Sequence, residues 1–188
     1  MKFIVKQSEP EEFRKWKEMA NENWQPAYKG LSGDPKNKVH ESLLKEQGYI
    51  CCYCNRYIDH KSSHIEHLVP QSEDKSRELD YNNLLASCQR RTEPKEPRHC
   101  GVLKADWYDS SLMIAPLDNN CEMRFSFIED GQIVSHDDND NAAKETIRRL
   151  GLGIDKLKKC VRKLLSRLLR CSVRINSIPK IFKTGLKV

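Results

Sequence analysis

The chain has 188 residues, which is enough for one domain with a modest core or for a small domain with extensions. Charged residues make up 32% of the chain and apolar residues 38%, so the surface must be large and polar relative to the interior. No stretch approaches the roughly 18 apolar residues of a membrane span, and residues 1–9 lack an apolar run of signal-peptide length. This composition excludes membrane-spanning functions and leads us to expect a cytoplasmic protein.

The first 49 residues predict an extension made of a strand and two helices. Residues 1–5 alternate weakly and are expected to form an edge strand. Pro10 and two acidic residues then open a helix in which Phe13, Trp16 and Met19 recur at helical spacing. Residues 30–35 predict a loop, and residues 38–47 predict a second helix that stops at Gly48.

Residues 50–110 form a cysteine-rich centre that is followed by a C-terminal region over residues 111–188. Residues 113–134 are expected to be extended, with a hairpin turn at Gly131. Residues 141–150 and 155–169 predict helices, and the second has one apolar stripe and Asp155 as its cap. The chain therefore predicts an α+β fold in which helices flank a small metal-stapled centre.

The C-terminal helices are strongly basic. Between Lys144 and Arg174 there are eleven Lys or Arg residues against two acidic ones. Such a density suits a polyanion, either nucleic acid or an acidic protein, and Arg162 and Lys163 are our candidates for nucleic-acid contacts. A solvated helix face would have the same composition, so charge alone does not decide between these interpretations.

Eight cysteines point to a metal site. In a reducing compartment, clustered cysteines indicate metal binding more often than disulfides. Cys51 and Cys54 have the C-x-x-C spacing that places two thiolates on one zinc ion, and Cys88 and Cys100 can complete a tetrahedral site. His99 is an alternative to Cys100. A redox pair is not favoured, because this C-x-x-C follows a helix instead of opening one. We interpret the other four as ordinary thiols: Cys52, Cys121, Cys160 and Cys171.

An acidic residue and a histidine lie between the two cysteine pairs. Glu66 and His67 are flanked by the strand formers Ile65, Leu68 and Val69, and Pro70 is expected to end the strand. The apolar run that follows Asn83 can pair with this strand. The two presumed zinc-binding segments would then hold a small hairpin rigid.

The order of these motifs resembles a known family. The run Cys-x-x-Cys, Ile-Glu-His-Leu-Val-Pro, Asn-Leu-Leu-x-x-Cys and Cys-x-x-x-Lys is similar to the HNH, or ββα-metal, endonucleases. The wider likeness includes Glu9-Pro10, His99-Cys100-Gly101 and the hairpin that ends at Gly131. It extends over nearly the whole chain and resembles the HNH nuclease subunits, PtuB, of Septu anti-phage systems and related retron systems.

This resemblance implies a role for each residue of the motif. His67 would be the general base, Glu66 would bind a catalytic Mg²⁺ or Mn²⁺, and Asn83 would orient the His67 ring through a hydrogen bond. Lys104 would contact a phosphate of the substrate, which is expected to be DNA. The resemblance also implies an ABC-type ATPase as a partner subunit in anti-phage defence.

One residue departs from the family pattern. Many HNH sites have a His or Asn directly after the last zinc-site cysteine, where it is the second protein ligand of the catalytic ion, but here that residue is Gly101. His99 and His64 are possible substitutes, and Asn82 is a weaker one. His64 would lie on the strand face of Glu66 because side chains alternate along a strand.

The sequence leaves two alternatives to a nuclease open. One is a zinc-stabilised nucleic-acid-binding module without catalysis, which would leave Glu66, His67 and Asn83 unexplained. The other is a degenerate HNH scaffold that serves only to bind a partner, and Gly101 is the residue that favours it.

Overall fold

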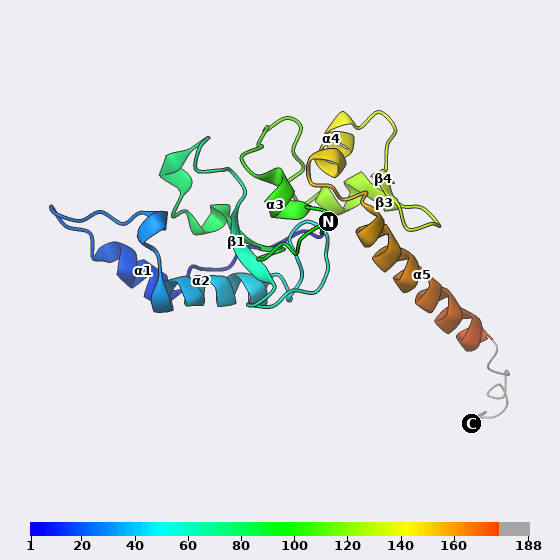
Figure 1. Ribbon diagram of the computed structural model, residues 1–188, viewed down its shortest axis with the longest axis horizontal. Coiled ribbons are helices and arrows are strands. Elements are labelled where there is room, and N and C mark those ends of the chain that lie inside the picture. The colour runs from blue at the N-terminus through cyan, green and yellow to red at the C-terminus, as the bar shows by residue number, and fades with distance from the viewer. Residues whose placement is uncertain (177–188) are drawn as a thin grey trace, which may run out of the picture.

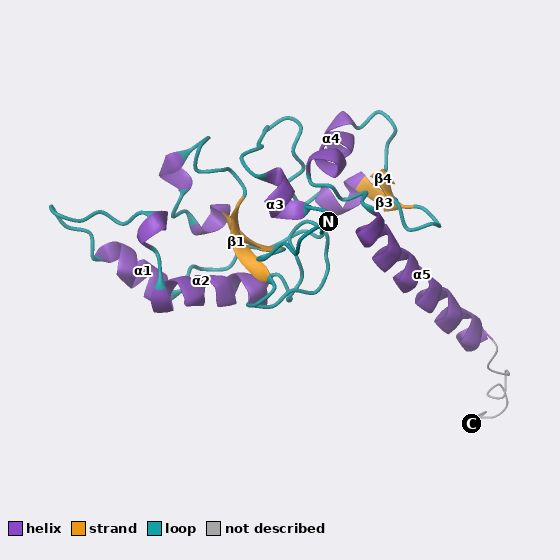
Figure 2. Cartoon of the chain, viewed as in Figure 1, coloured by secondary structure: helices purple, strands orange, loops and turns teal. Residues whose placement is uncertain are grey.

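The computed structural model describes residues 1–176, with side chains as far as Arg167, and it has an α+β fold (Figures 1 and 2). Its helices and strands are α1 (Glu11–Glu18), α2 (Gly33–Glu46), β1 (Ser63–His67), β2 (Leu84–Cys88), α3 (Cys100–Lys104), β3 (Phe125–Phe127), β4 (Ile133–Ser135), α4 (Asn141–Arg149) and α5 (Asp155–Asn176). Short 3₁₀ turns include Tyr28–Gly30, Lys75–Arg77, Tyr81–Asn83 and Cys121–Arg124. In the described part, no helix is both long enough and apolar enough to cross a membrane.

The central hairpin confirms the predicted pairing of the two apolar runs. β1 and β2 are antiparallel, with Ile65 opposite Ala86 and Glu66 opposite Leu85. Every residue of β2 is buried, so this strand lies inside the core beside the partly exposed β1. β1 ends at His67, earlier than the predicted end at Pro70.

Helix α2 packs against β2 and fixes the position of the cysteine-rich segment. Val39, Leu43 and Leu44 are buried on its inner face. At its C-terminal end, the Gln47 side-chain amide donates to Ala86 O at 2.9 Å and its carbonyl accepts from Ala86 N at 2.7 Å. Gly48 then turns the chain in the left-handed region, with φ +64°. This turn leads the chain directly into Cys51.

Three predicted elements differ from the structure. Residues 1–5 do not form a strand; Ile4 N donates to Pro116 O at 2.8 Å within an irregular segment. Helix α2 begins at Gly33 instead of residue 38, because Pro35 lies in the first turn, where its missing N–H costs no hydrogen bond. Between residue 113 and β3 the chain forms turns instead of the predicted extended structure.

The C-terminal hairpin and the two C-terminal helices lie where they were predicted, but Asp155 is the first residue of α5 and not its cap. β3 pairs with β4, and Gly131 (φ +87°) lies in the turn between them. A Cβ at Gly131 would lie 2.5 Å from Lys158 O, so the turn packs directly on the backbone of α5. From this contact α5 projects away from α1 and α2 (Figure 1) and continues to Asn176, beyond the predicted end. Residues 177–188 of the predicted C-terminal region lie outside the described residues.

A buried histidine on α2 predicts acid sensitivity. His40 is 5% exposed and its Nε2 lies 2.8 Å from Ser63 Oγ. Burial, with a smaller contribution from His60, lowers the pKa of His40 from 6.5 to about 4. The folded state therefore prefers the neutral ring, so its contribution to stability is complete above pH 6.5 and is lost as the pH falls toward 4. The loss should be on the order of 3 kcal/mol.

This contribution can be isolated by urea unfolding between pH 7 and pH 4. The variant His40→Gln keeps a polar partner for Ser63 but cannot titrate, so its free energy of unfolding should decline less steeply with acid than that of the wild type. His136 is exposed, and His136→Gln should follow the wild-type curve. Parallel curves for wild type and His40→Gln would contradict the prediction.

Candidate metal centre and active site

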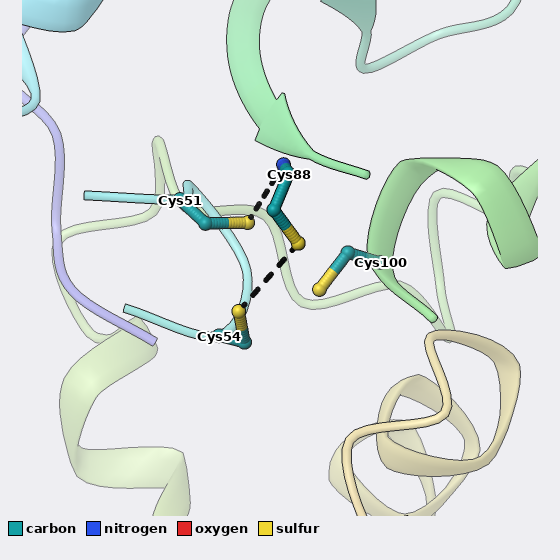
Figure 3. Close-up of side chains that lie close together, drawn as sticks. All are labelled: Cys51, Cys54, Cys88 and Cys100. Atoms are coloured by element: carbon teal, nitrogen blue, oxygen red, sulfur yellow. Dashed lines mark hydrogen bonds between the residues drawn. The ribbon is translucent and has the colours of Figure 1, made fainter. Parts of the chain in front are cut away.

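Four cysteine side chains meet beside the central hairpin (Figure 3). Cys51 and Cys54 come from the loop after α2, Cys88 ends β2, and Cys100 begins α3. Their sulfur atoms all lie within 4.8 Å of one another. Cys88 N also donates to Cys51 Sγ at 3.4 Å. The cluster therefore brings together the four cysteines predicted as a zinc site and ties three separate segments to one point.

The electrostatics of this cluster favour a cation at its centre. Burial alone would raise the pKa of Cys51, but hydrogen bonds from neighbouring thiols, Cys100 first among them, hold it well below its usual range. Burial instead raises the pKa of Cys100 well above its usual range. Four ionised sulfurs at this separation would repel one another unless a cation lay between them. Four thiolates in this arrangement suit Zn²⁺.

His99 lies beside the cluster without replacing Cys100. Its ring is fully buried, with Nδ1 at 3.1 Å from Cys100 Sγ and 3.6 Å from Cys88 Sγ. Its Nε2 has no hydrogen-bond partner among the described residues. Nδ1 faces the sulfurs, so His99 is placed to donate a hydrogen bond to them.

Glu66 lies at the wall of an open pocket of about 320 Å³ next to the cluster, lined also by His67, Gln71, Gly101 and Asp106. Its two oxygens have different surroundings. Oε1 accepts from Tyr53 Oη at 3.2 Å and pairs with Lys104 Nζ at 3.1 Å. Oε2 instead lies 3.4 Å from His64 Nε2. Oε1 is thus bound by two buried side chains, whereas Oε2 contacts His64.

Gly101 makes this arrangement possible. A Cβ at position 101 would lie 2.3 Å from Glu66 Oε2 and 2.9 Å from His64 Nε2. The residue that lacks a ligand atom therefore provides the space into which the carboxylate and the imidazole extend. The structure brings His64, and not His99, next to Glu66, and it confirms that His64 and Glu66 share one strand face. The space and its donor set, one carboxylate oxygen and one imidazole nitrogen, fit a divalent ion such as Mn²⁺.

The ring of His67 is held by a backbone carbonyl and an aromatic ring. Its Nε2 lies 3.0 Å from Glu78 O, which can only accept, so Nε2 carries the proton and Nδ1 keeps the lone pair of the neutral ring. The Tyr28 ring packs at 4.4 Å between centroids and nearly perpendicular to it. Burial lowers the pKa of His67 below its usual value, although the hydrogen bond to Glu78 opposes this. The neutral ring can therefore accept a proton at neutral pH.

The predicted hydrogen bond from Asn83 to His67 is absent from the described structure. Asn83 is fully buried, and its Oδ1 accepts from Val69 N at 2.8 Å while its Nδ2 donates to Val69 O and Arg77 O. All of its amide groups are used by the loop that follows β1. Asn83 instead joins Val69 to Arg77, the residue before Glu78, whose carbonyl contacts His67.

The three predicted nucleic-acid contacts have different environments. Lys104 is 2% exposed and its ammonium is turned toward Glu66, so in this structure it does not present itself at the surface as a phosphate contact would. Arg162 and Lys163 are exposed on α5. For all three residues, nucleic-acid binding stays a prediction.

Two groups of the site are missing from the sequence-based prediction. Tyr53 is fully buried between the zinc-site cysteines and the carboxylate, and burial followed by the Glu66 charge raises its pKa, so it remains a donor. Its position inside the C-x-x-C turn was the available signal. The Glu78 carbonyl carries no sequence signal, because any residue would supply the same atom.

The chain resembles a retron protein by sequence. No protein-family model matches it. It is 28% identical over 141 residues to a protein of Vibrio cholerae serotype O1 biovar El Tor that carries the name "Retron Vc95 putative HNH endonuclease". The match covers 71% of this chain and 66% of the relative, so the chain spans just under two thirds of that protein's length. The chain is therefore distantly homologous to a retron protein named as an HNH endonuclease.

Proposed function

We propose that the protein is a metal-dependent HNH endonuclease that hydrolyses phosphodiester bonds in nucleic acid, DNA being the expected substrate. One observation carries this proposal: the His67 ring, whose Nε2 donates to Glu78 O, lines the same pocket as Glu66, whose Oε2 lies 3.4 Å from His64 Nε2. A nuclease of this type needs a neutral imidazole and a carboxylate at one phosphate. A module that only bound nucleic acid would not need either group.

In the proposed reaction, His67 Nδ1 takes a proton from a water molecule as its oxygen attacks phosphorus. The new P–O bond forms as the bond from phosphorus to the 3′ oxygen breaks, and the released 3′ oxygen takes a proton from solvent, which leaves a 5′ phosphate and a 3′ hydroxyl. Glu66 Oε2 and His64 Nε2 would hold the divalent ion, which when bound supplies positive charge at the phosphate. The imidazole ligand favours Mn²⁺ over Mg²⁺, which prefers oxygen.

The cysteine cluster is proposed to hold a structural Zn²⁺ in what would be a ββα-metal core. All four donors are cysteines and three of them are buried, so the site is closed to substrate as structural zinc sites are. The ion would join the turn before β1, the end of β2 and the start of α3, and these segments position Glu66 and Gly101.

We further propose that the protein acts as the effector nuclease of an anti-phage defence complex with an ABC-type ATPase. The role in anti-phage defence is supported by the word "Retron" in the name of the relative. The ATPase partner rests on the resemblance of the chain to Septu nuclease subunits. Arg162 and Lys163 on α5 are proposed to contact the nucleic-acid backbone, and such contacts would weaken steeply with salt.

The proposal is tested by incubating the protein with supercoiled plasmid and Mn²⁺ or Mg²⁺, alone and with its ATPase partner. Wild type should nick or linearise the plasmid, and Glu66→Gln should lower the rate by at least about 100-fold because the ion loses its carboxylate. Glu73→Gln changes an exposed glutamate and should cut at the wild-type rate. An RNA substrate is incubated in parallel under the same conditions. If neither the plasmid nor the RNA is cleaved, the proposal is wrong.

Gly101→Ala should impair the site without removing any ligand. The added Cβ would lie 2.3 Å from Glu66 Oε2, so the carboxylate must move. Displacing a catalytic group by about 1 Å can lower a rate by about 100-fold, and we expect a loss of that order. In Gly153→Ala the nearest atom would be 3.9 Å from the new Cβ, so this variant is the matched control and should retain activity. Equal cleavage rates in the two variants would show that the carboxylate does not need the space at Gly101.

A further inference from the structure

The site contains a buried positive charge that the proposed reaction does not use. Lys104 is 2% exposed, and its Nζ lies 3.1 Å from Glu66 Oε1 and donates to His67 O at 3.0 Å. It belongs to α3, which begins at the cysteine cluster. The ammonium is therefore buried behind Glu66, on the carboxylate oxygen Oε1, while Glu66 itself lines the pocket in which it would bind a divalent ion.

The charges around Glu66 do not favour an ion in the free protein. Its carboxylate is already neutralised by Lys104, and its contacts with His64 and Tyr53 add no negative charge. A divalent ion on Oε2 would share this buried carboxylate with the ammonium, and the two positive charges would repel each other across it. Asp106 also lines the pocket, but it is exposed to solvent, which screens its charge, and none of the contacts of Glu66 is with it. A nucleic-acid phosphate in the pocket would supply negative charge directly at the ion.

We propose that Lys104 is a resident countercharge that keeps the affinity of the free protein for divalent ions low and so makes ion binding depend on nucleic acid. The inference rests on the proposed nuclease function and adds that the divalent ion binds tightly only when nucleic acid is bound. Because binding free energies are reciprocal, the phosphate must tighten ion binding by the same factor by which the ion tightens nucleic-acid binding. The free protein then has little ion at its active site and is protected from adventitious hydrolysis.

A purely structural lysine would have the opposite signature. If Lys104 served only to hold Glu66 in place, its removal would loosen the carboxylate and weaken ion binding. As a countercharge, its removal leaves Glu66 with a free negative charge and strengthens ion binding, while Tyr53 still donates to Oε1. The sign of the change in Mn²⁺ affinity therefore separates the two roles without any measurement of activity.

The experiment measures Mn²⁺ affinity by calorimetric titration or by the electron paramagnetic resonance of free Mn²⁺. It uses the full chain with His67→Ala, so that substrate is not cut, with and without a short duplex DNA, and a second series uses RNA of the same sequence. The nucleic acid should tighten Mn²⁺ binding about tenfold or more. Adding Lys104→Met should tighten Mn²⁺ binding by a similar factor when no nucleic acid is present. Nucleic acid should then increase the Mn²⁺ affinity of this variant less than it does in the parent chain. Lys104→Arg keeps the charge and should keep the low affinity.

Lys6→Met is the matched control, because Lys6 also forms a largely buried pair with a glutamate, Glu46, at a different place in the fold. It should leave Mn²⁺ affinity unchanged. Equal or weaker Mn²⁺ binding in folded Lys104→Met would overturn the inference. If Lys104→Met does not fold, the His67→Ala chain alone still tests the inference. Equal Mn²⁺ affinity of that chain with and without nucleic acid, whether DNA or RNA, would also overturn the inference. If Mn²⁺ binding requires Glu66, the nuclease proposal stands even when the inference about Lys104 fails. If no Mn²⁺ binds even with nucleic acid present, both the nuclease proposal and the inference about Lys104 are wrong.

Discussion

Replacing His67 with alanine is expected to lower the rate of phosphodiester cleavage by about 10²- to 10⁴-fold, which is the usual contribution of a positioned general base. The contact of Nε2 with Glu78 O leaves Nδ1 as the basic atom. Burial lowers the pKa of the ring, so the neutral form should persist through neutral pH. The wild-type rate should therefore stay level at neutral pH and fall only at pH values below the usual imidazole range.

Two comparisons isolate this effect. His136→Ala removes an exposed histidine and should cleave at the wild-type rate and with the same pH profile. Mn²⁺ binding to His67→Ala in the presence of DNA should remain, because the ion is assigned to Glu66 and His64. A His67→Ala protein that cleaves at the wild-type rate would show that another group takes the proton.

Removing the proposed zinc ion, or one of its ligands, is expected to unfold the centre of the molecule. Zinc bound by four cysteines contributes about 10 kcal/mol or more in small domains, which is as large as the whole stability of many proteins. Cys100→Ser and treatment with a strong chelator should each abolish the cooperative unfolding transition of the wild type. Zinc content by mass spectrometry should fall from one equivalent to near zero in the same samples.

Cysteines outside the cluster provide the controls. Cys121 is fully buried but does not belong to the cluster, and Cys160 is exposed. Cys121→Ser should cost no more than about 1–3 kcal/mol for a buried hydroxyl, and Cys160→Ser should cost almost nothing. Both should keep one zinc ion. A chelated protein with an unchanged unfolding transition would show that the four sulfurs do not need a metal.

Local patterns were sufficient to predict most of the secondary structure and the four cysteines. Helical spacing located α1, α4 and most of α2, and the spacing Cys51-x-x-Cys54 identified half of the cluster, because both signals depend on residues that are close in sequence. The strand predicted for residues 1–5 was wrong because it, too, rested on a local pattern alone. A strand needs a partner strand, and whether one is present is a property of the whole fold.

The candidate site, too, could be predicted only in part from local sequence. Glu66, His67 and the cysteines could be chosen from sequence, because their side-chain chemistry and spacing are characteristic of metal and acid–base sites. The contacts that give each residue its role could not, since they join segments far apart in the chain. Asn83 binds the loop around Val69 instead of the His67 ring, and Glu78 supplies only a carbonyl.

Gly101 and Lys104 show the difference most clearly. From sequence, Gly101 was a missing ligand and Lys104 a phosphate contact. In the folded chain α3 brings both against the Glu66 carboxylate, where Gly101 supplies space and Lys104 supplies charge. The sequence by itself determined which chemical groups are available. Only the tertiary structure decided which of them meet, because a buried carboxylate is defined by what packs around it.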